Sequence, residues 1–307
     1  MEFTGGMTLI GGMTVTQQPP SYSAYAIFGY GDRGTSITNL VSNTGVVATD
    51  TGGVGTQRFG LAAASYGTDK VIFGYGTPNF STPLSMTNLV SNTGVVATDT
   101  AGVGTARYYL AAAGYGTDKA IFGRGQDSGG PTSVTNLVSN TGVVATNTTG
   151  VGSAVRALAA AGYGTDKAIF GYGETISTTN LISNTGVVGN NVTGVGTARY
   201  ALAAAGYGSD KAIFGYGFSS GPSTIYSITN LVSNTGVVAT DTTGVGTARY
   251  YLAASTYGTN KAIFGYGDSG TVSSLTNLVS DTGVVATNTT GVGTARSFLA
   301  AASYGST

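Results

Sequence analysis

The chain has 307 residues, of which 51 are glycine and only 8% are charged. Lys+Arg and Asp+Glu both number 13, so no net charge attracts phosphate backbones or anionic lipid, and we expect neither nucleic acid nor a membrane as a partner. The absence of His and Cys removes imidazole bases, thiolate nucleophiles, disulfides and the usual zinc and copper ligands. No metal or cofactor is therefore expected.

Residues 1–22 precede the repetitive part of the chain and contain the sequence Gly-Gly-Met-Thr twice, at 5–8 and at 11–14. Glu2 stands where a signal peptide carries positive charge, and no run approaches the ~18 apolar residues of a membrane span. We interpret this segment as a docking arm that adds as a strand to a neighbouring chain or to the repeats. The apolar residues expected to make the contact are Met7, Leu9, Ile10, Met13 and Val15.

Three markers recur together from residue 23 onward. The asparagine of Thr-Asn-Leu stands at 39, 88, 136, 180, 230 and 277, at intervals of 49, 48, 44, 50 and 47 residues. The segment Ile-Phe-Gly recurs in step with it, with its phenylalanine at 28, 73, 122, 170, 214 and 264. A single arginine also recurs in each unit, at Arg58, Arg107, Arg156, Arg199, Arg249 and Arg296.

Each unit predicts four short strands and no helix. In the unit that begins at Arg107 they are expected over residues 109–115, 119–123, 134–139 and 142–147, with turn residues between them. Four strands in about 47 residues are typical of a β-propeller blade. We expect the alanine-rich first strand to lie innermost, where blades converge and only small side chains fit.

The two ends of the repetitive part are complementary. Residues 297–304 supply a first strand without a second, and residues 24–31 supply a second strand without a first. We therefore predict one all-β domain over residues 23–307. It is a six-bladed β-propeller of four-stranded blades, closed by pairing of the N- and C-terminal strands in one blade.

The repeat unit resembles the Kelch repeat, in which an arginine precedes the inner strand, the second strand ends in a glycine pair and a Trp packs the fourth strand. The recurring arginines and the sequence Phe73-Gly74-Tyr75-Gly76 match this pattern, whereas Val95 and Val143 stand in place of the Trp. The resemblance implies a β-propeller. It does not extend to the copper oxidases with Kelch repeats, because their chemistry needs His and Cys.

Most repeated side chains favour structural roles. The arginines are expected to bond loop carbonyls or a carboxylate rather than an anionic ligand, and the Asp-Lys pairs, such as Asp118-Lys119, to form turns. The tyrosines that follow Phe-Gly, such as Tyr75, are expected to pack between blades rather than stack on sugar. Arg124 takes the place of this tyrosine in one unit.

The loops between the second and third strands differ in length and sequence, and strand alternation places them on the same face as the connections from fourth to first strands. We expect this variable face to bind a partner or ligand. Its candidate residues are Asp32, Arg33, Phe80, Arg124, Asp127, Glu174, Phe218, Tyr226 and Asp268.

These features favour a non-enzymatic structural or interaction protein. The near-identity of the repeats and the short leader are similar to virion and appendage proteins of tailed bacteriophages. We therefore expect a virion component, such as a capsid decoration or tail-fibre protein, that binds other virion proteins through its arm. The alternative is an adhesin that binds host-surface glycan through the variable face, and the third is a hydrolase using the loop carboxylates Asp32, Asp127, Glu174 and Asp268.

The docking arm gives a first testable prediction. Deletion of residues 1–20 is expected to leave the repeats folded, with an unchanged thermal unfolding midpoint, and to abolish assembly, measured by cosedimentation with the particle. A shortened chain that still assembles would show that the arm is dispensable.

Overall fold

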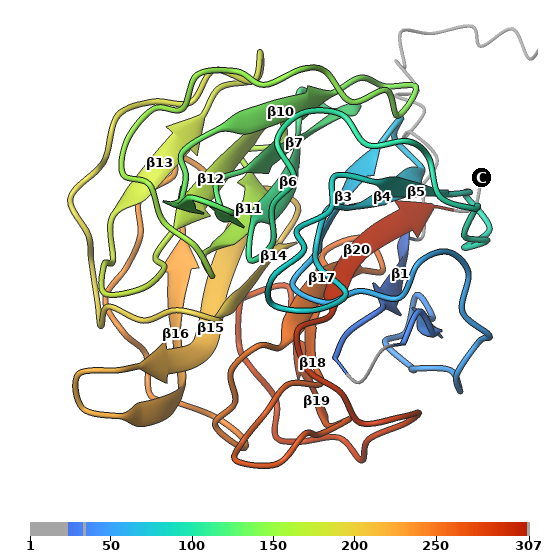
Figure 1. Ribbon diagram of the computed structural model, residues 1–307. Helices are drawn as coiled ribbons and strands as arrows, with labels where there is room; N and C mark the ends of the chain where they lie inside the picture. Colours follow the sequence, from blue (N-terminus) through green and yellow to red (C-terminus); the bar gives the residue numbers. More distant parts are fainter. Residues whose placement is uncertain (1–23, 33–34, 306–307) are drawn as a thin grey trace, which may run out of the picture.

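The computed structural model describes residues 24–32 and 35–305, and this part of the chain is all-β without helices. The predicted docking arm, including Met7, Leu9, Ile10, Met13 and Val15, lies outside the described residues, and so does Arg33. Six three-stranded antiparallel sheets and one two-stranded hairpin make up the fold (Figure 1).

Each sheet takes its three strands from one repeat, except the last, which joins the two ends of the chain. The sheets are β3 (Ala62–Tyr66), β4 (Lys70–Gly74) and β5 (Thr87–Val90); β6 (Ala111–Tyr115), β7 (Lys119–Gly123) and β10 (Thr135–Val138); β11 (Ala159–Tyr163), β12 (Lys167–Gly171) and β13 (Thr179–Ile182); β14 (Ala203–Tyr207), β15 (Lys211–Ser219) and β16 (Thr224–Val232); β17 (Ala253–Tyr257), β18 (Lys261–Gly265) and β19 (Thr276–Val279); and β20 (Ala300–Gly305), β1 (Ala24–Gly29) and β2 (Thr38–Val41). The hairpin is β8 (Gln126–Asp127) and β9 (Gly130–Pro131).

The fourth predicted strand of each unit is not a continuous strand. In the unit of β5, only isolated bridges form, between Thr87 and Thr100 and between Val90 and Val96, and their registers differ by one residue. The side chain of Asn88 explains the interruption, because its Nδ2 donates to the carbonyl of Ala97 at 3.0 Å. A side-chain amide thus replaces part of the backbone ladder.

The same segment corrects a prediction about packing. Val95 and Val143, which the Kelch resemblance aligns with the packing Trp of the fourth strand, are 67% and 66% exposed. The next residue of each pair, Val96 or Val144, packs against the core instead. The interrupted ladder shifts the inward side by one residue, so the prediction is wrong by one position.

The first strands of neighbouring sheets lie side by side around the molecule: β3 contacts β6, and the series continues through β11, β14, β17 and β20 back to β3. Within the last sheet, β20 pairs antiparallel with β1, with Ala24 opposite Gly305 and Gly29 opposite Ala300. Figure 1 shows the sheets arranged in this order about a common centre. This arrangement is compatible with a β-propeller-like fold.

A series of backbone hydrogen bonds links the sheets where their first strands begin. In each unit, one residue stands directly before the leucine that leads into the first strand. Its N–H donates to the carbonyl of the equivalent residue in the preceding sheet, at 2.7 to 2.9 Å. All six have positive φ, between 50° and 61°, which orients the peptide groups toward one another. The sixth bond returns to the first residue of the series. The six residues are Gly60, Tyr109, Ala157, Ala201, Tyr251 and Phe298.

Aromatic rings fill the space between sheets. Tyr75 of one sheet meets Phe122 of the next edge-to-face, with ring centroids 5.1 Å apart. Gly74 is required for this approach, because a Cβ there would lie 2.7 Å from the Phe122 ring. The Tyr75 hydroxyl donates to the carbonyl of Val103 at 3.1 Å, so the predicted packing role of this tyrosine is confirmed.

The recurring arginine is buried, and each of its three guanidinium nitrogens donates a hydrogen bond. Arg107 donates to the carbonyls of Arg124 and Thr105, both at 2.9 Å, and to Asn136 Oδ1 at 2.8 Å. Its guanidinium carbon also lies 4.5 Å from the centroid of the Tyr75 ring in the preceding sheet. The structural role predicted for the arginine is confirmed here. The same contacts recur at Arg58, Arg199, Arg249 and Arg296.

Arg156 does not belong to this series, which corrects the sequence analysis. The other five arginines stand three residues before the leucine of their unit, whereas Arg156 stands two residues before Leu158. Val155, 4% exposed, occupies the structural position of the missing arginine. The intervals between the recurring arginines vary by several residues, so this one-residue displacement of Arg156 was not evident from the spacing.

Arg124 supplies the guanidinium that Val155 cannot. Its side chain reaches from one sheet to the next, where Nη2 donates to Asn180 Oδ1 at 2.6 Å and to the carbonyl of Val151 at 3.0 Å. Arg124 is only 2% exposed, so its predicted place on the exposed variable face is wrong. Burial lowers the pKa of its guanidinium to about 10, which leaves it charged at neutral pH. In the other units, a tyrosine after the second strand faces an arginine of the next sheet. Here Arg124 stands at the tyrosine position and Val155 at the arginine position.

This exchange predicts strong coupling between the two positions. Arg124→Tyr alone leaves Asn180 without its charged partner and is expected to lower the free energy of unfolding by about 2–3 kcal/mol. Val155→Arg alone forces a second guanidinium beside Arg124 and is also destabilising. The double variant restores the common pattern and is expected to lie within about 1 kcal/mol of the parent in urea unfolding. Additive losses in the double variant would contradict the exchange.

Candidate functional site

The variable loops and the segments that precede the first strands meet at one end of the molecule. Tyr200 forms reciprocal backbone hydrogen bonds with Phe218, both at 2.9 Å, and Phe59 does the same with Thr77. Each bridge fastens the start of a variable loop to the entry of an inner strand. The predicted co-location of these segments is confirmed.

Three aromatic side chains stand at the centre of this end, on residues of the backbone hydrogen-bond series. The rings of Tyr251 and Phe298 are stacked with centroids 3.7 Å apart, and Tyr109 lies 5.6 Å from Tyr251. All three are partly exposed. The counterparts Ala157 and Ala201 carry small side chains, so the aromatic rings are gathered on one side of the centre.

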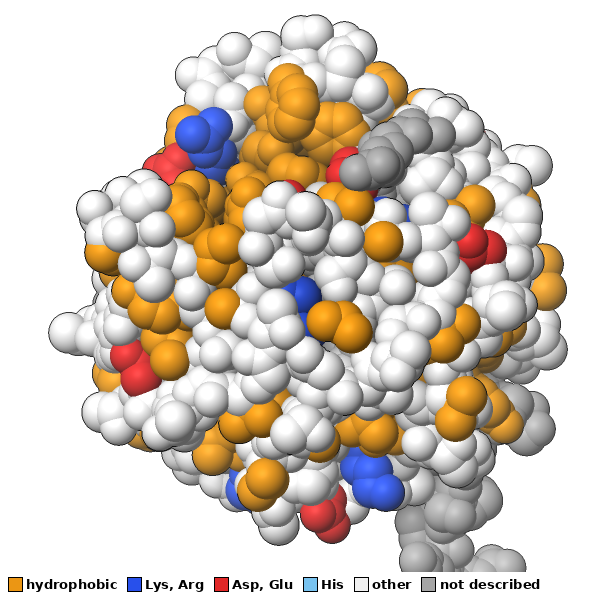
Figure 2. Space-filling model, turned by 90° about the horizontal axis from the view of Figure 1, so that it is seen from below, with side chains coloured by type: hydrophobic (Ala, Val, Ile, Leu, Met, Phe, Trp, Pro, Cys, Tyr) orange, Lys and Arg blue, Asp and Glu red, His pale blue; other side chains and the backbone are white. Residues whose placement is uncertain are grey.

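Further rings extend this group outward. Phe59 contacts Phe298 at 5.7 Å and Phe80 at 4.8 Å between centroids. On another side, Tyr250 contacts Tyr251 at 5.0 Å. We call the whole set the aromatic face, and Figure 2 shows hydrophobic side chains gathered on this end of the molecule. Its members are Phe59, Phe80, Tyr108, Tyr109, Tyr200, Phe218, Tyr250, Tyr251 and Phe298.

A polar group borders the aromatic face. Arg156 Nε lies 2.8 Å from Glu174 Oε1, and another of its nitrogens donates to Gln126 Oε1. The side chains of Arg156 and Glu174 are 42% and 35% exposed. Because Arg124 performs the buried role in this unit, Arg156 is free to present its charge beside the aromatic rings.

The charge of Arg156 acts on two tyrosine hydroxyls of the aromatic face. Burial raises the pKa of Tyr251 to about 12, and the charge of Arg156 acts in the opposite direction. Burial also raises the pKa of Tyr109, which Tyr251 and Tyr108 raise further and Arg156 lowers. Both hydroxyls therefore remain protonated at neutral pH and can donate hydrogen bonds.

The predicted loop aspartates bond within the chain: two of them cap their own turns, and Asp32 links its loop to the entry of β20. Asp127 Oδ1 accepts from the N–H of Gly129 and Asp268 Oδ1 from that of Gly270, both at 2.7 Å. Asp32 Oδ1 accepts from the N–H of Ser297 at 2.7 Å. Over residues 24–32 and 35–305, no three acidic side chains gather as a metal site would require.

The other candidates divide between two places. Phe80 and Phe218 belong to the aromatic face, and Glu174 borders it. Tyr226 lies opposite Gly217 in the long β15–β16 hairpin. Sequence reasoning missed most of the aromatic face, including Tyr109, Tyr251 and Phe298. One feature of the sequence could have revealed these residues. The two residues between the arginine and the leucine vary from unit to unit, whereas the sequence on either side of them repeats.

Comparison with known proteins adds no relatives: no protein-family model matches the chain, and no curated protein is similar to it. Within the described ranges, no helix has the length and apolar character needed to cross a membrane.

Buried tyrosines predict a loss of stability in alkali. Burial raises the pKa of Tyr172 and Tyr216 to about 12, from 10.0 in the unfolded chain. The folded state then retains protons that the unfolded state loses, so the stabilisation is complete below pH 10 and is lost as the pH rises to about 12. Each tyrosine contributes on the order of 3 kcal/mol.

Urea unfolding at a series of pH values measures this effect, with tyrosinate absorbance as a second readout. Tyr216→Phe is the matched control, and its free energy of unfolding is expected to fall less between pH 10 and pH 12 than that of the parent. Equal slopes for the two proteins would contradict the assignment.

Proposed function

We propose that the chain is a closed six-bladed β-propeller that acts as a non-enzymatic binding protein and recognises carbohydrate through its aromatic face. The six sheets, the β1–β20 pairing and the returning series of backbone hydrogen bonds support the architecture. In this proposal, each blade consists of three strands and the interrupted fourth segment. The scaffold holds one face of differentiated side chains.

The partly exposed row of aromatic rings is the observation that carries the proposal. Aromatic rings bind the apolar faces of sugar rings, and the tyrosine hydroxyls, Arg156, Glu174 and Gln126 can bond sugar hydroxyls. Phe80 is 65% exposed, which is unusual for a phenylalanine without a partner to cover it.

Several observations favour binding over catalysis. The loop carboxylates of Asp127 and Asp268 cap their own turns, and Glu174 is paired with Arg156. Glycoside hydrolysis requires two carboxyl groups that face one bond at a defined separation. The carboxylates are spread over different loops, which supports a binding role.

A glycan array followed by titration calorimetry tests this proposal. Phe80→Ala removes an exposed ring and is expected to weaken binding of the best array ligand roughly three- to tenfold. Val95→Ala, which removes an equally exposed apolar side chain elsewhere, is the matched control and is expected to leave binding unchanged. Failure of the parent protein to retain any glycan, or equal affinity of both variants, would contradict the proposal.

Exposed valines favour a second candidate, a structural component of an assembly such as the virion of a tailed bacteriophage. One valine per repeat is 65% to 67% exposed, and repeated apolar side chains of this kind suit lateral packing against other proteins. Electron microscopy of the native particle tests this candidate: a fixed site on the particle supports it, and absence from purified particles contradicts it. The valines are Val46, Val95, Val143, Val187, Val237 and Val284.

A further inference from the structure

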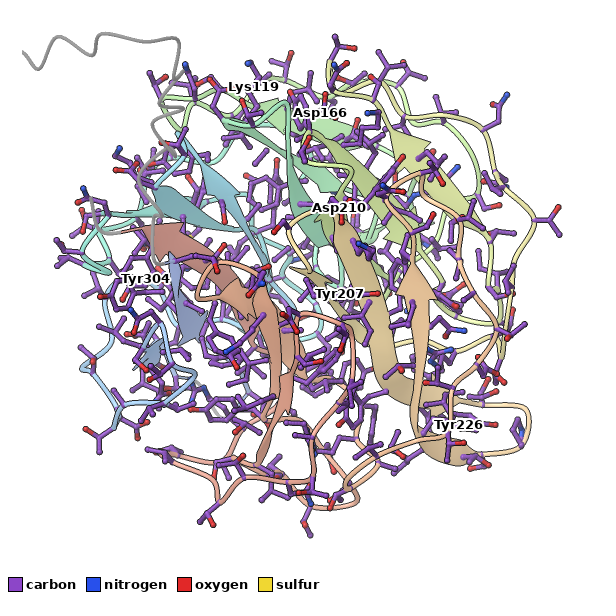
Figure 3. The ribbon with its side chains drawn as sticks, turned by 180° about the vertical axis from the view of Figure 1, so that it is seen from behind. Lys119, Asp166, Tyr207, Asp210, Tyr226 and Tyr304 are labelled. Carbon is purple, nitrogen blue, oxygen red and sulfur yellow. The ribbon has the colours of Figure 1, made fainter. Side chains whose placement is uncertain are left out.

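A cavity of about 280 Å³ opens at the end of the molecule opposite the aromatic face. It is lined by the ends of the inner strands and by the turns that lead from first to second strands. The inner strands begin at the aromatic face and end at these turns, and Figure 3 shows Lys119, Asp166 and Asp210 of the turns well apart from Tyr226 of the β15–β16 hairpin. The cavity is therefore separate from the proposed carbohydrate site.

Three lysines of consecutive sheets, Lys119, Lys167 and Lys211, contribute to the lining. Each ammonium lies 2.8 to 2.9 Å from the carboxylate of the preceding aspartate. An ammonium has three N–H donors, so each lysine retains two for a ligand. No carboxylate is among the residues that line the cavity, whereas several hydroxyl groups are. The side chains at the wall thus consist mainly of hydrogen-bond donors.

Three glycines leave space on the same side as these lysines. Gly114, Gly162 and Gly206 lie inside the inner strands, and none has a positive φ that would require glycine. A Cβ on Gly162 would meet its nearest neighbour, the carbonyl oxygen of Gly114, at an ordinary 3.5 Å. Glycine within a strand reduces stability and marks places where another group approaches closely.

The other half of the wall is different. At the position of these glycines, the remaining three sheets carry Ser65, Thr256 and Ser303. Ser65 Oγ donates to the carbonyl of Ser303 at 2.6 Å, and Thr256 Oγ1 donates to that of Gly206 at 3.0 Å. These hydroxyls bond to the chain itself. The open half of the cavity therefore coincides with the half that carries the three lysines.

The turns at the mouth add hydroxyl groups in an unfavourable conformation. Thr117 and Thr165 line the cavity with φ of 71° and 69°, a region that β-branched residues rarely adopt. Asparagine or glycine would fit this turn with less strain. Strained residues that persist at a cavity are typical of binding sites.

We propose that this cavity binds a small anion with several oxygen acceptors, such as a phosphate ester, a sulfate ester or a polycarboxylate. The ammonium groups of Lys119, Lys167 and Lys211 and the turn hydroxyls donate to its oxygens, and the glycines provide room for it. The volume lies at the lower limit of ordinary ligand pockets, which restricts the ligand to about the size of a monosaccharide derivative.

Titration calorimetry of the full chain at low ionic strength tests the site, with pyrophosphate, inorganic sulfate and citrate as separate probes. The parent protein is expected to bind at least one of them, and the tightest probe distinguishes a phosphate, sulfate or polycarboxylate ligand. The triple variant Lys119→Gln, Lys167→Gln and Lys211→Gln is expected to bind at least tenfold more weakly. No binding by the parent, or preference for a neutral hexose, would overturn the proposal.

Two controls separate the site from general charge effects. Lys70→Gln with Lys261→Gln changes the equivalent turn lysines that do not line the cavity, and binding is expected to stay within twofold of the parent. Gly162→Ala adds a methyl group to the cavity wall near Lys167 without a change of charge and is expected to weaken binding several-fold. Gly189→Ala, which introduces the alanine found in other repeats, is its matched control.

Thermal unfolding of each variant reports whether it is folded. If the triple-lysine variant fails to fold, Gly162→Ala decides the outcome by itself. Unchanged binding in Gly162→Ala or in a folded triple-lysine variant would place the anion elsewhere and overturn the proposal.

Discussion

Buried guanidinium groups fix the segments of each repeat relative to one another. Each joins the entry of an inner strand, the end of the second strand and the asparagine of the third, and most stack on a tyrosine of the preceding sheet. A buried arginine is tolerated only when its donors are bonded, so each one fixes the relative positions of all these segments. Six of the 13 basic residues are used in this way.

The repeat pattern in the sequence was sufficient to predict the first three strands of every unit, because turn residues and small or β-branched residues recur at fixed positions. It was not sufficient for the fourth segment, where the side chain of Asn88 and its counterparts replaces backbone pairing. A ladder that a side chain interrupts looks like an ordinary strand in the sequence. The one-residue error between Val95 and Val96 has the same origin.

The candidate sites were harder to predict because they arise from differences between repeats. Arg156 appeared to continue the arginine series, and only alignment on the leucine reveals that Val155 holds that position. The sequence marked Arg124 as exceptional. Its side chain points inward because the next sheet has Val155 in place of the usual arginine, and this is seen only when two neighbouring units are compared. Tyr109, Tyr251 and Phe298 meet only because the sheets surround a common centre.

The pairing of β20 with β1 has a consequence for how the protein is made. Arg296 bonds to the carbonyl of Tyr30 across 266 residues of sequence, so the sheet at this junction forms only when almost the whole chain has been synthesised. At typical rates of translation, β1 exposes an unpaired edge for roughly 15–50 s. During that interval the β20 of another molecule is an equivalent partner, and high local concentration favours strand-exchanged oligomers. A slower rate of synthesis therefore favours pairing of β1 with the β20 of its own chain.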